Sequence, residues 1–115
     1  MTKDEFLESF VNKNYHDDIL KAFGDNWEYA RVTKLSEDLV VYRYYGGDAG
    51  PEGFYFTTTL VDDPVSQLAL TSNTAEYVVE VIIPKGSVVL EGGVGALDGL
   101  PGGGYQIYSP IRLGP

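Results

Sequence analysis

The sequence contains no cysteine and a single histidine, His16. The absence of cysteine excludes disulfide bonds, thiolate metal ligands and a cysteine nucleophile. A catalytic triad or a zinc site would have only His16 to build on, and this residue lies in a polar stretch, so we expect it on the solvated surface. We therefore predict no metal site.

Long hydrophobic runs are also missing. No segment approaches the roughly 20 apolar residues that a membrane-spanning helix needs. The N-terminal segment, MTKDEFLESF, is acidic and lacks the apolar stretch of a signal peptide. We therefore expect no membrane span, and a protein that either acts in the cytoplasm or is delivered as an effector into the cytoplasm of a target cell.

Positive charge is scarce. Lysine and arginine number 8 against 17 aspartates and glutamates, which gives a formal net charge of −9 at pH 7. Nucleic acid is disfavoured as a partner, because phosphate binding depends on lysine and arginine replacing counterions, and an anionic membrane surface is disfavoured for the same reason. A basic partner protein remains compatible with this charge.

Apolar and aromatic residues are plentiful enough for a folded core. They make up 43% of the 115 residues and include 9 tyrosines and 5 phenylalanines, which argues against disorder. A chain of this length has room for one core only, so we expect a single domain spanning residues 1–115. Helical patterns in residues 1–24 precede strand patterns in residues 38–110. This order predicts an α+β fold in which N-terminal helices cap a mixed or antiparallel sheet.

Capping signals locate three helices. Thr2 followed by Glu5 matches a capping box, and a second short helix over residues 15–23 ends at Gly24, which suits the left-handed conformation. Asp63 before Pro64 predicts a further short helix, because aspartate caps helices and proline is favoured at their first position.

Strand-like residues recur in the rest of the chain. We expect strands at residues 38–45 and 54–59, which would form the first half of the sheet. The Val- and Ile-rich segment 76–83 reads as a central strand that is covered on both faces. Shorter strands follow at residues 87–91 and 105–108.

Arg43 is the first candidate functional residue, because it interrupts the apolar aromatic segment LVVYRYY. A guanidinium in such a strand needs a carboxylate, a phosphate or an aromatic face as its partner. A structural ion pair with one of the 17 acidic residues and a bound anionic ligand are equally good explanations.

Two further features stand out. Gly102, Gly103 and Gly104 in the segment LPGGGYQIY allow a backbone to approach a ligand and to turn amides toward an anion, although a sharp turn into the last strand explains such glycines more often. In the segment FYFTTT, Tyr55 and Thr57 share one face and could meet a flat aromatic ligand and a sugar, whereas core packing explains any one aromatic residue equally well.

In order and spacing these pieces resemble the NAD-glycohydrolase toxin domains typified by the tuberculosis necrotizing toxin, which are related to ADP-ribosyltransferases. The matching stretches, within about residues 40–110, are YRYYGGDAGPEGFYFTTT and EYVVEVIIPKGSVVLEGGVGALDGLPGGGYQIYSP. The resemblance implies a split sheet of the ADP-ribosyltransferase-like kind, NAD or NADP as the substrate rather than a cofactor, and a cognate immunity protein as inhibitor.

The resemblance also implies roles for individual residues. Arg43 matches the NAD-binding arginine, Gln106 the catalytic glutamine and Tyr55 the aromatic-strand tyrosine, with the adjacent Phe54 as the alternative for that position. Thr57 and Gly102–Gly104 would line the substrate. The family's second arginine is missing, since the chain has no arginine between Arg43 and Arg112, so Lys85 or Arg112 would have to replace it, or Arg43 and backbone amides would act alone.

Three functions follow as hypotheses. The first is hydrolysis of the nicotinamide–ribose bond by a toxin or effector; nicotinamide is a good leaving group, so positioning and electrostatics can suffice. The second is mono-ADP-ribosyl transfer to a macromolecule. Gln106 argues against this function, because ADP-ribosyltransferases usually carry a glutamate at the matching position. The third is a non-enzymatic, acidic protein-interaction domain.

Overall fold

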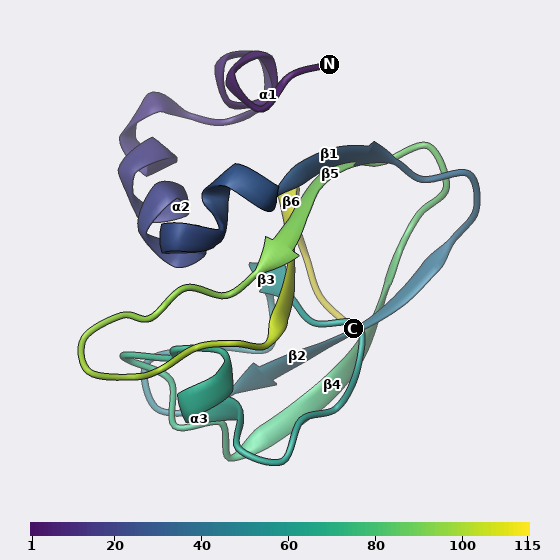
Figure 1. The fold of residues 1–115 in the computed structure, drawn as a ribbon. Helices are drawn as coiled ribbons and strands as arrows, with labels where there is room; N and C mark the ends of the chain where they lie inside the picture. The colour runs from purple at the N-terminus through teal and green to yellow at the C-terminus, as the bar shows by residue number, and fades with distance from the viewer.

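The structure is a computed structural model that describes all 115 residues. Helices dominate the N-terminal quarter and strands the remainder (Figure 1). The elements, with η marking 3-10 helices, are α1 (Lys3–Phe10), η1 (Lys13–Tyr15), α2 (His16–Phe23), η2 (Gly24–Tyr29), β1 (Arg31–Lys34), β2 (Leu39–Tyr45), β3 (Gly53–Phe56), α3 (Pro64–Gln67), β4 (Tyr77–Ile83), β5 (Val88–Gly93) and β6 (Tyr105–Leu113). None of the helices is both long and apolar enough to cross a membrane.

The strands form two separate antiparallel sheets, which confirms the predicted α+β class. One sheet has the order β1-β5-β6-β3 and the other pairs β2 with β4. In Figure 1, α1 and α2 lie on one side of the four-stranded sheet, and β2 and β4 lie on the other. The four-stranded sheet is therefore covered on both faces.

Each face of that sheet contributes to its own hydrophobic core. Leu90 and Tyr108 point toward the helices, while Val89 and Ile107 point toward β2 and β4. This follows from the alternation of side chains along a strand. The helix-side core consists of Phe6, Leu7, Val11, Ile19, Phe23, Ala30, Leu90 and Tyr108. The other core consists of Val41, Phe56, Val81, Ile83, Val89 and Ile107.

The capping box and the Asp63 cap are confirmed, whereas Gly24 ends α2 with φ 51 and ψ −129 and so is not in the left-handed helical conformation. His16 is not a solvated surface residue. Thr2 and Glu5 form the capping box of α1, and the side chain of Asp63 accepts from the backbone N–H of Ser66 at the start of α3. The Nε2 atom of His16 lies 3.0 Å from the carbonyl oxygens of both Leu7 and Val11, at the end of α1. The Leu7 oxygen also accepts from the backbone N–H of Val11, so His16 adds a second contact at the end of α1 and joins α1 to α2.

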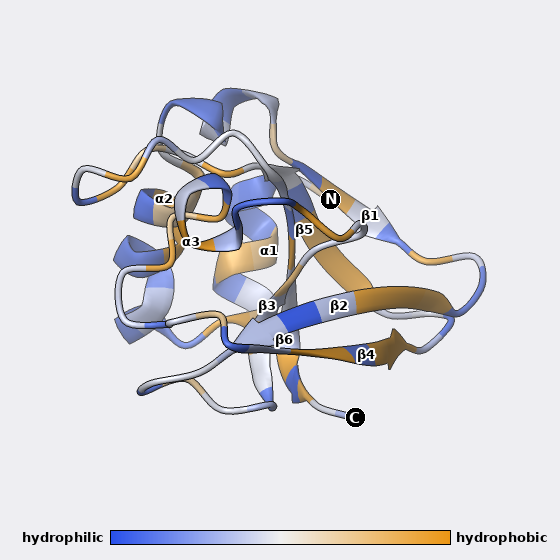
Figure 2. Cartoon of the chain, turned by 90° about the horizontal axis from the view of Figure 1, so that it is seen from below, coloured by the Kyte–Doolittle hydropathy of each residue, from blue (hydrophilic) through white to orange (hydrophobic).

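The prediction that residues 76–83 form a central strand covered on both faces is wrong. β4 is an edge strand with β2 as its only neighbour, and Figure 2 shows this hydrophobic strand at the side of the molecule. Val81 and Ile83 are buried, but Ile82 is 57% exposed. A continuous apolar run predicts burial of both faces of a strand, whereas β4 buries one face only.

The predicted first half of the sheet is also split between the two sheets. β2 and β3 belong to different sheets and meet at a single bridge between Tyr42 and Thr57. Strand β1 was missed, and β6 extends beyond the predicted residue 108 to Leu113. The extension includes Pro110, which has no backbone N–H to donate to a neighbouring strand. The register between β3 and β6 shifts between Gly53 and Tyr55. A local pattern cannot show which strands pair.

Candidate functional site

A cleft of about 380 Å³ opens between α2, the end of β2, the strand β3 and the segment that follows α3. It brings together four of the residues predicted from sequence to form a site, which are Arg43, Tyr55, Thr57 and Gln106. Arg43 lies in β2, Tyr55 in β3 and Gln106 in β6, and Thr57 directly follows β3. The bridge between Tyr42 and Thr57 joins the two sheets at this point. The cleft is also lined by Phe56, Leu68, Ala69, Leu70, Val94 and Leu97, which give it apolar walls, and by the polar Asn73.

Arg43 bonds to backbone carbonyls and to no carboxylate. Its Nε donates to the oxygen of Gly50 at 3.0 Å and its Nη1 to the oxygen of Tyr55 at 3.1 Å. The guanidinium packs against Gly53, where a side chain would collide with it. The two ion pairs of the chain involve Arg31 and Arg112, so Arg43 keeps an uncompensated positive charge.

Burial lowers the pKa of Arg43 from its ordinary value, and the charge of Arg112 lowers it further. Both effects oppose the charged form, but an arginine stays protonated throughout the physiological range. Arg43 is in neither ion pair of the chain, so the explanation of Arg43 as a structural ion-pair partner is wrong. Its positive charge is open to an anionic ligand, for which the planar guanidinium is well suited.

Gln106 is oriented by two backbone carbonyls. Its Nε2 donates to the oxygen of Ala22 at 3.0 Å and to that of Gly93 at 3.2 Å, and only the amide nitrogen of glutamine can donate to carbonyls. Gln106 is 6% exposed and lines the cleft. None of its side-chain polar atoms is both buried and without a hydrogen-bond partner. Its Oε1 accepts no hydrogen bond within the chain and is the atom left to face the cleft.

Tyr55 and Thr57 line the cleft on the strand side. The ring of Tyr55 packs edge-on against Tyr108, with 5.1 Å between ring centroids. Burial raises the pKa of the Tyr55 hydroxyl, and the neighbouring Tyr108 and Asp18 raise it further, so the phenol is neutral at physiological pH. The hydroxyl of Thr57 donates to the oxygen of Thr59 at 3.3 Å.

Phe54 lies away from the cleft. Its ring stacks on Tyr108 with 6.0 Å between the ring centroids and lies 6.3 Å from the ring of Tyr15, packed against the helix-side core. Of the two neighbouring aromatic residues, Tyr55 is therefore the one that lines the cleft. Phe54 lies between Tyr15 of η1 and Tyr108 of β6.

The backbone amides of the glycine turn, Gly102–Gly104, donate hydrogen bonds to other segments of the chain. The amides of Gly102, Gly103 and Gly104 donate to the carbonyls of Ser66, Val94 and Gln67 at 2.8, 2.9 and 2.9 Å. None of these three amides is left to bind an anion, so of the two explanations that the sequence left open, the turn into the last strand holds. Gly102 has φ +70, and a Cβ on it would lie 2.5 Å from the oxygen of Gly95. The glycines instead allow the turn to pack tightly beside the cleft.

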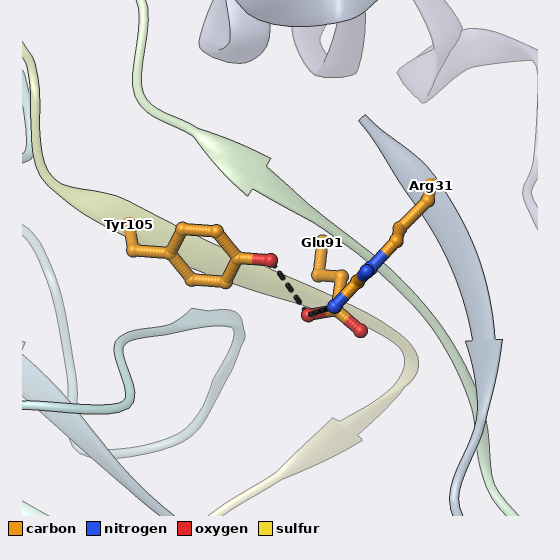
Figure 3. A network of polar contacts seen from close by, with 3 residues as sticks. All are labelled: Arg31, Glu91 and Tyr105. Atoms are coloured by element: carbon orange, nitrogen blue, oxygen red, sulfur yellow. Dashed lines mark hydrogen bonds and ion pairs between the residues drawn. The ribbon is translucent and has the colours of Figure 1, made fainter. Parts of the chain in front are cut away.

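A polar network holds β6 from the opposite face of its sheet (Figure 3). The hydroxyl of Tyr105 donates to Oε1 of Glu91 at 2.6 Å, and the same oxygen lies 3.5 Å from Nη2 of Arg31. The network links β1, β5 and β6 one residue before Gln106. Because adjacent side chains of a strand point to opposite faces, fixing Tyr105 here leaves Gln106 facing the helices and the cleft.

This network shifts two pKa values. Burial acts to raise the pKa of Glu91, but hydrogen bonds from Thr33 and Tyr105 and the charge of Arg31 outweigh it, so the pKa is lowered. Burial, followed by the bond to Glu91, raises the pKa of Tyr105 to about 12. Glu91 is therefore ionised and Tyr105 neutral near pH 7.

The fold has a solved counterpart. The chain superposes on the structure of Tse6 in complex with Tsi6 with a TM-score of 0.69, covering 99% of this chain and 91% of that chain. The chain shares the fold of Tse6. The sequence identity is 16%, so the likeness concerns the fold alone. No family model and no curated protein matches the sequence.

Lys85 and Arg112, the two suggested replacements for a second arginine, do not line the cleft of this Tse6-like fold. Lys85 lies in the turn between β4 and β5, where its backbone N–H donates to Asp38. Arg112 pairs with Glu52 at 3.8 Å. Neither side chain supplies a second positive charge to the cleft walls.

Sequence reasoning missed the contribution of α2 and of residues 68–73. Asp18, Lys21 and Ala22 line the cleft, so α2 forms a wall of the site as well as part of the helical cap. Their spacing of three and four residues is the signal that could have revealed a shared helix face. No group of three or more histidine, aspartate or glutamate side chains that could hold a metal ion is present.

Proposed function

We propose that this chain is an NAD(P)+ glycohydrolase that acts as a toxin or effector domain. The observation that carries the proposal is the convergence of Arg43, Tyr55 and Gln106 on one cleft, with the guanidinium free of carboxylates and Gln106 Oε1 free of hydrogen bonds. An unpaired cation next to a neutral acceptor and an aromatic ring suits a molecule that combines a diphosphate, a ribose and a flat ring.

Each residue has a distinct role in the proposed reaction. Arg43 binds the diphosphate, and Tyr55 lies beside the nicotinamide ring. Gln106 Oε1 accepts a hydrogen bond from a ribose hydroxyl or from the attacking water. The bond between ribose C1′ and the nicotinamide nitrogen breaks, its electron pair leaves with neutral nicotinamide, and water adds to C1′ and releases a proton. The acceleration comes from orientation and from electrostatic stabilisation of the ribosyl cation.

Release of nicotinamide from NAD+ by the purified protein tests the proposal. We expect turnover with the wild type and its loss in Arg43→Ala and Gln106→Ala, each checked for retention of fold by circular dichroism. Lys34→Ala is the control, because this exposed cation of β1 lies outside the cleft and outside the network of Arg31, Glu91 and Tyr105. No nicotinamide release at high protein concentration contradicts the proposal, and ADP-ribose attached to a protein in a lysate indicates transfer instead of hydrolysis.

We also propose an inhibitor protein as the partner and the cytoplasm of a target cell as the site of action. Tse6, whose fold this chain shares, was solved in complex with Tsi6, which supports the expectation of a protein partner. A partner with a basic surface suits the net charge of −9. An enzyme that consumes NAD in the cell that makes it requires such an inhibitor.

A further inference from the structure

Helix α2 turns a charged face toward the cleft. Asp18, Lys21 and Ala22 lie on that face, whereas Ile19 and Phe23 are fully buried in the helix-side core. The two apolar residues fix the rotation of the helix, so the charged side chains have a defined direction. Gln106 Nε2 and the Gly95 N–H both donate hydrogen bonds to the oxygen of Ala22. These bonds hold α2 at a defined position relative to β6.

The charges on this face are unpaired. The two ion pairs of the chain are Arg31 with Glu91 and Arg112 with Glu52, so neither Asp18 nor Lys21 takes part in one. Four formal charges line the cleft, which are the cations Lys21 and Arg43 and the anions Asp18 and Asp48. Two of the 8 basic residues therefore face this one cleft without ion pairs, although the chain carries 17 acidic residues.

The positions of these charges differ along the cleft. Asp18 acts electrostatically on Tyr55, since its charge is one of the causes, after burial and Tyr108, that raise the pKa of the Tyr55 hydroxyl. Lys21 lies one turn further along α2. The helix thus presents to one cleft a negative charge that acts on Tyr55 and, three residues later, a positive charge.

Oxidised NAD has the complementary distribution of charge. Its nicotinamide ring carries one positive charge, and its diphosphate carries two negative charges. ADP-ribose has the same diphosphate but lacks the nicotinamide, so it has no positive charge. The two ligands therefore separate recognition of the ring from recognition of the diphosphate.

We propose that α2 is part of the dinucleotide site, with Asp18 recognising the cationic nicotinamide ring and Lys21 binding the diphosphate together with Arg43. The proposal rests on the function proposed above and extends it. Lys21 supplies the second cation that the strands lack, and Asp18 makes the site selective for the oxidised over the reduced dinucleotide.

Binding of two ligands that are not hydrolysed tests this assignment by isothermal titration calorimetry. The ligands are a carbocyclic analogue of NAD+, which retains the cationic ring, and ADP-ribose. Asp18→Asn should weaken binding of the analogue about three- to fivefold, as expected for an exposed charge pair, and leave ADP-ribose binding unchanged. Lys21→Gln should weaken binding of both ligands by a similar factor.

Two control variants match these changes. Asp17→Asn alters the neighbouring residue of α2 and Lys13→Gln alters a lysine of η1, and neither residue lines the cleft. Both variants should bind the two ligands like the wild type. Equal weakening of both ligands by Asp18→Asn, or no effect of Lys21→Gln, overturns the proposal.

The outcome is separable from that of the proposed hydrolysis. If the wild type releases nicotinamide and the α2 variants bind normally, this inference fails and the enzymatic function stands. If the variants give the expected pattern without any nicotinamide release, the α2 assignment stands and hydrolysis is wrong. Binding of neither ligand by the wild type overturns both.

Discussion

The side-chain amide of Gln106 donates a hydrogen bond to the backbone oxygen of Ala22 across 84 residues of sequence, at 3.0 Å. This bond ties the last strand to α2, the helix that forms one wall of the cleft. A second bond from the same nitrogen, to Gly93, leaves Oε1 as the atom that faces a ligand. The nitrogen of this amide group thus supports the fold, and its oxygen has the proposed catalytic role.

Changing Gln106 to glutamate should destabilise the fold. A carboxylate cannot donate to the carbonyls of Ala22 and Gly93, so we expect a loss of about 2–3 kcal/mol in the free energy of unfolding, measured by urea denaturation. Gln67→Glu is the control. Gln67 Oε1 accepts from the backbone N–H of Asp63 at 2.9 Å, and a carboxylate preserves that acceptor. Equal stability of the two variants would contradict this account.

Changing Gly53 to alanine should impair ligand binding more than folding. The added Cβ would collide with the guanidinium of Arg43, which is the end of a flexible side chain and can move away. We expect a rise in KM of about tenfold, in keeping with loss of a charge-assisted contact, and little change in melting temperature. Gly50→Ala should leave KM unchanged, because a Cβ there meets no atom within 4 Å.

Changing Gly102 to alanine should destabilise the protein more than changing Gly103. Both residues have positive φ, +70 and +94, so each substitution strains the backbone by about 1–2 kcal/mol. At Gly102 the Cβ would also lie 2.5 Å from the oxygen of Gly95, whereas at Gly103 it meets nothing within 4 Å. We expect an additional cost of about 2 kcal/mol for Gly102→Ala in urea denaturation. Similar costs for both variants would indicate strain without collision.

The network around Glu91 should make stability depend on pH at both extremes. The folded state lowers the pKa of Glu91, so its stabilising effect is present above the ordinary value of 4.5 and is lost as the pH falls through the lower folded value. The folded state raises the pKa of Tyr105 from 10.0 to about 12, so its contribution is present below pH 10.0 and is lost as the pH rises toward 12.

Tyr105→Phe isolates these contributions, because Tyr55 and Tyr108 also have raised pKa values. Relative to the wild type, the variant should lose less stability between pH 10 and 12 and between pH 5 and 3. Chemical denaturation at intervals of one pH unit measures both slopes. Parallel pH profiles for the two proteins would show that the network does not contribute.

The sequence was sufficient for features that depend on near neighbours. The capping box of Thr2 and Glu5 forms within one turn, and Asp63 caps the helix that Pro64 begins, so both could be recognised locally. The strand over LVVYRYY was predicted for the same reason, from the dense β-branched and aromatic residues. Residues Arg43, Tyr55 and Gln106 were chosen by type and order, and all three line the cleft.

The sequence pattern failed where burial depends on partners distant in the chain. The Val- and Ile-rich strand β4 lies at an edge because β2 is its only neighbour, which no local pattern records. The sequence left open whether the amides of Gly102–Gly104 face an anion or only form a turn, and in the structure they bond to carbonyls of α3 and of Val94. Phe54 and Tyr55 could be told apart only by which of them packs on Tyr15 and which lines the cleft.

By itself, the sequence determined the α+β class, the positions of the caps and the scarcity of cations from which a binding site could be built. Only the tertiary structure decided that Arg43 has no carboxylate partner, that Gln106 presents its oxygen to the cleft and that α2 forms a wall. The physical reason is that short-range patterns follow from backbone sterics and adjacent side chains. The cleft depends instead on contacts such as that between Gln106 and Ala22, which form only when the whole chain is packed.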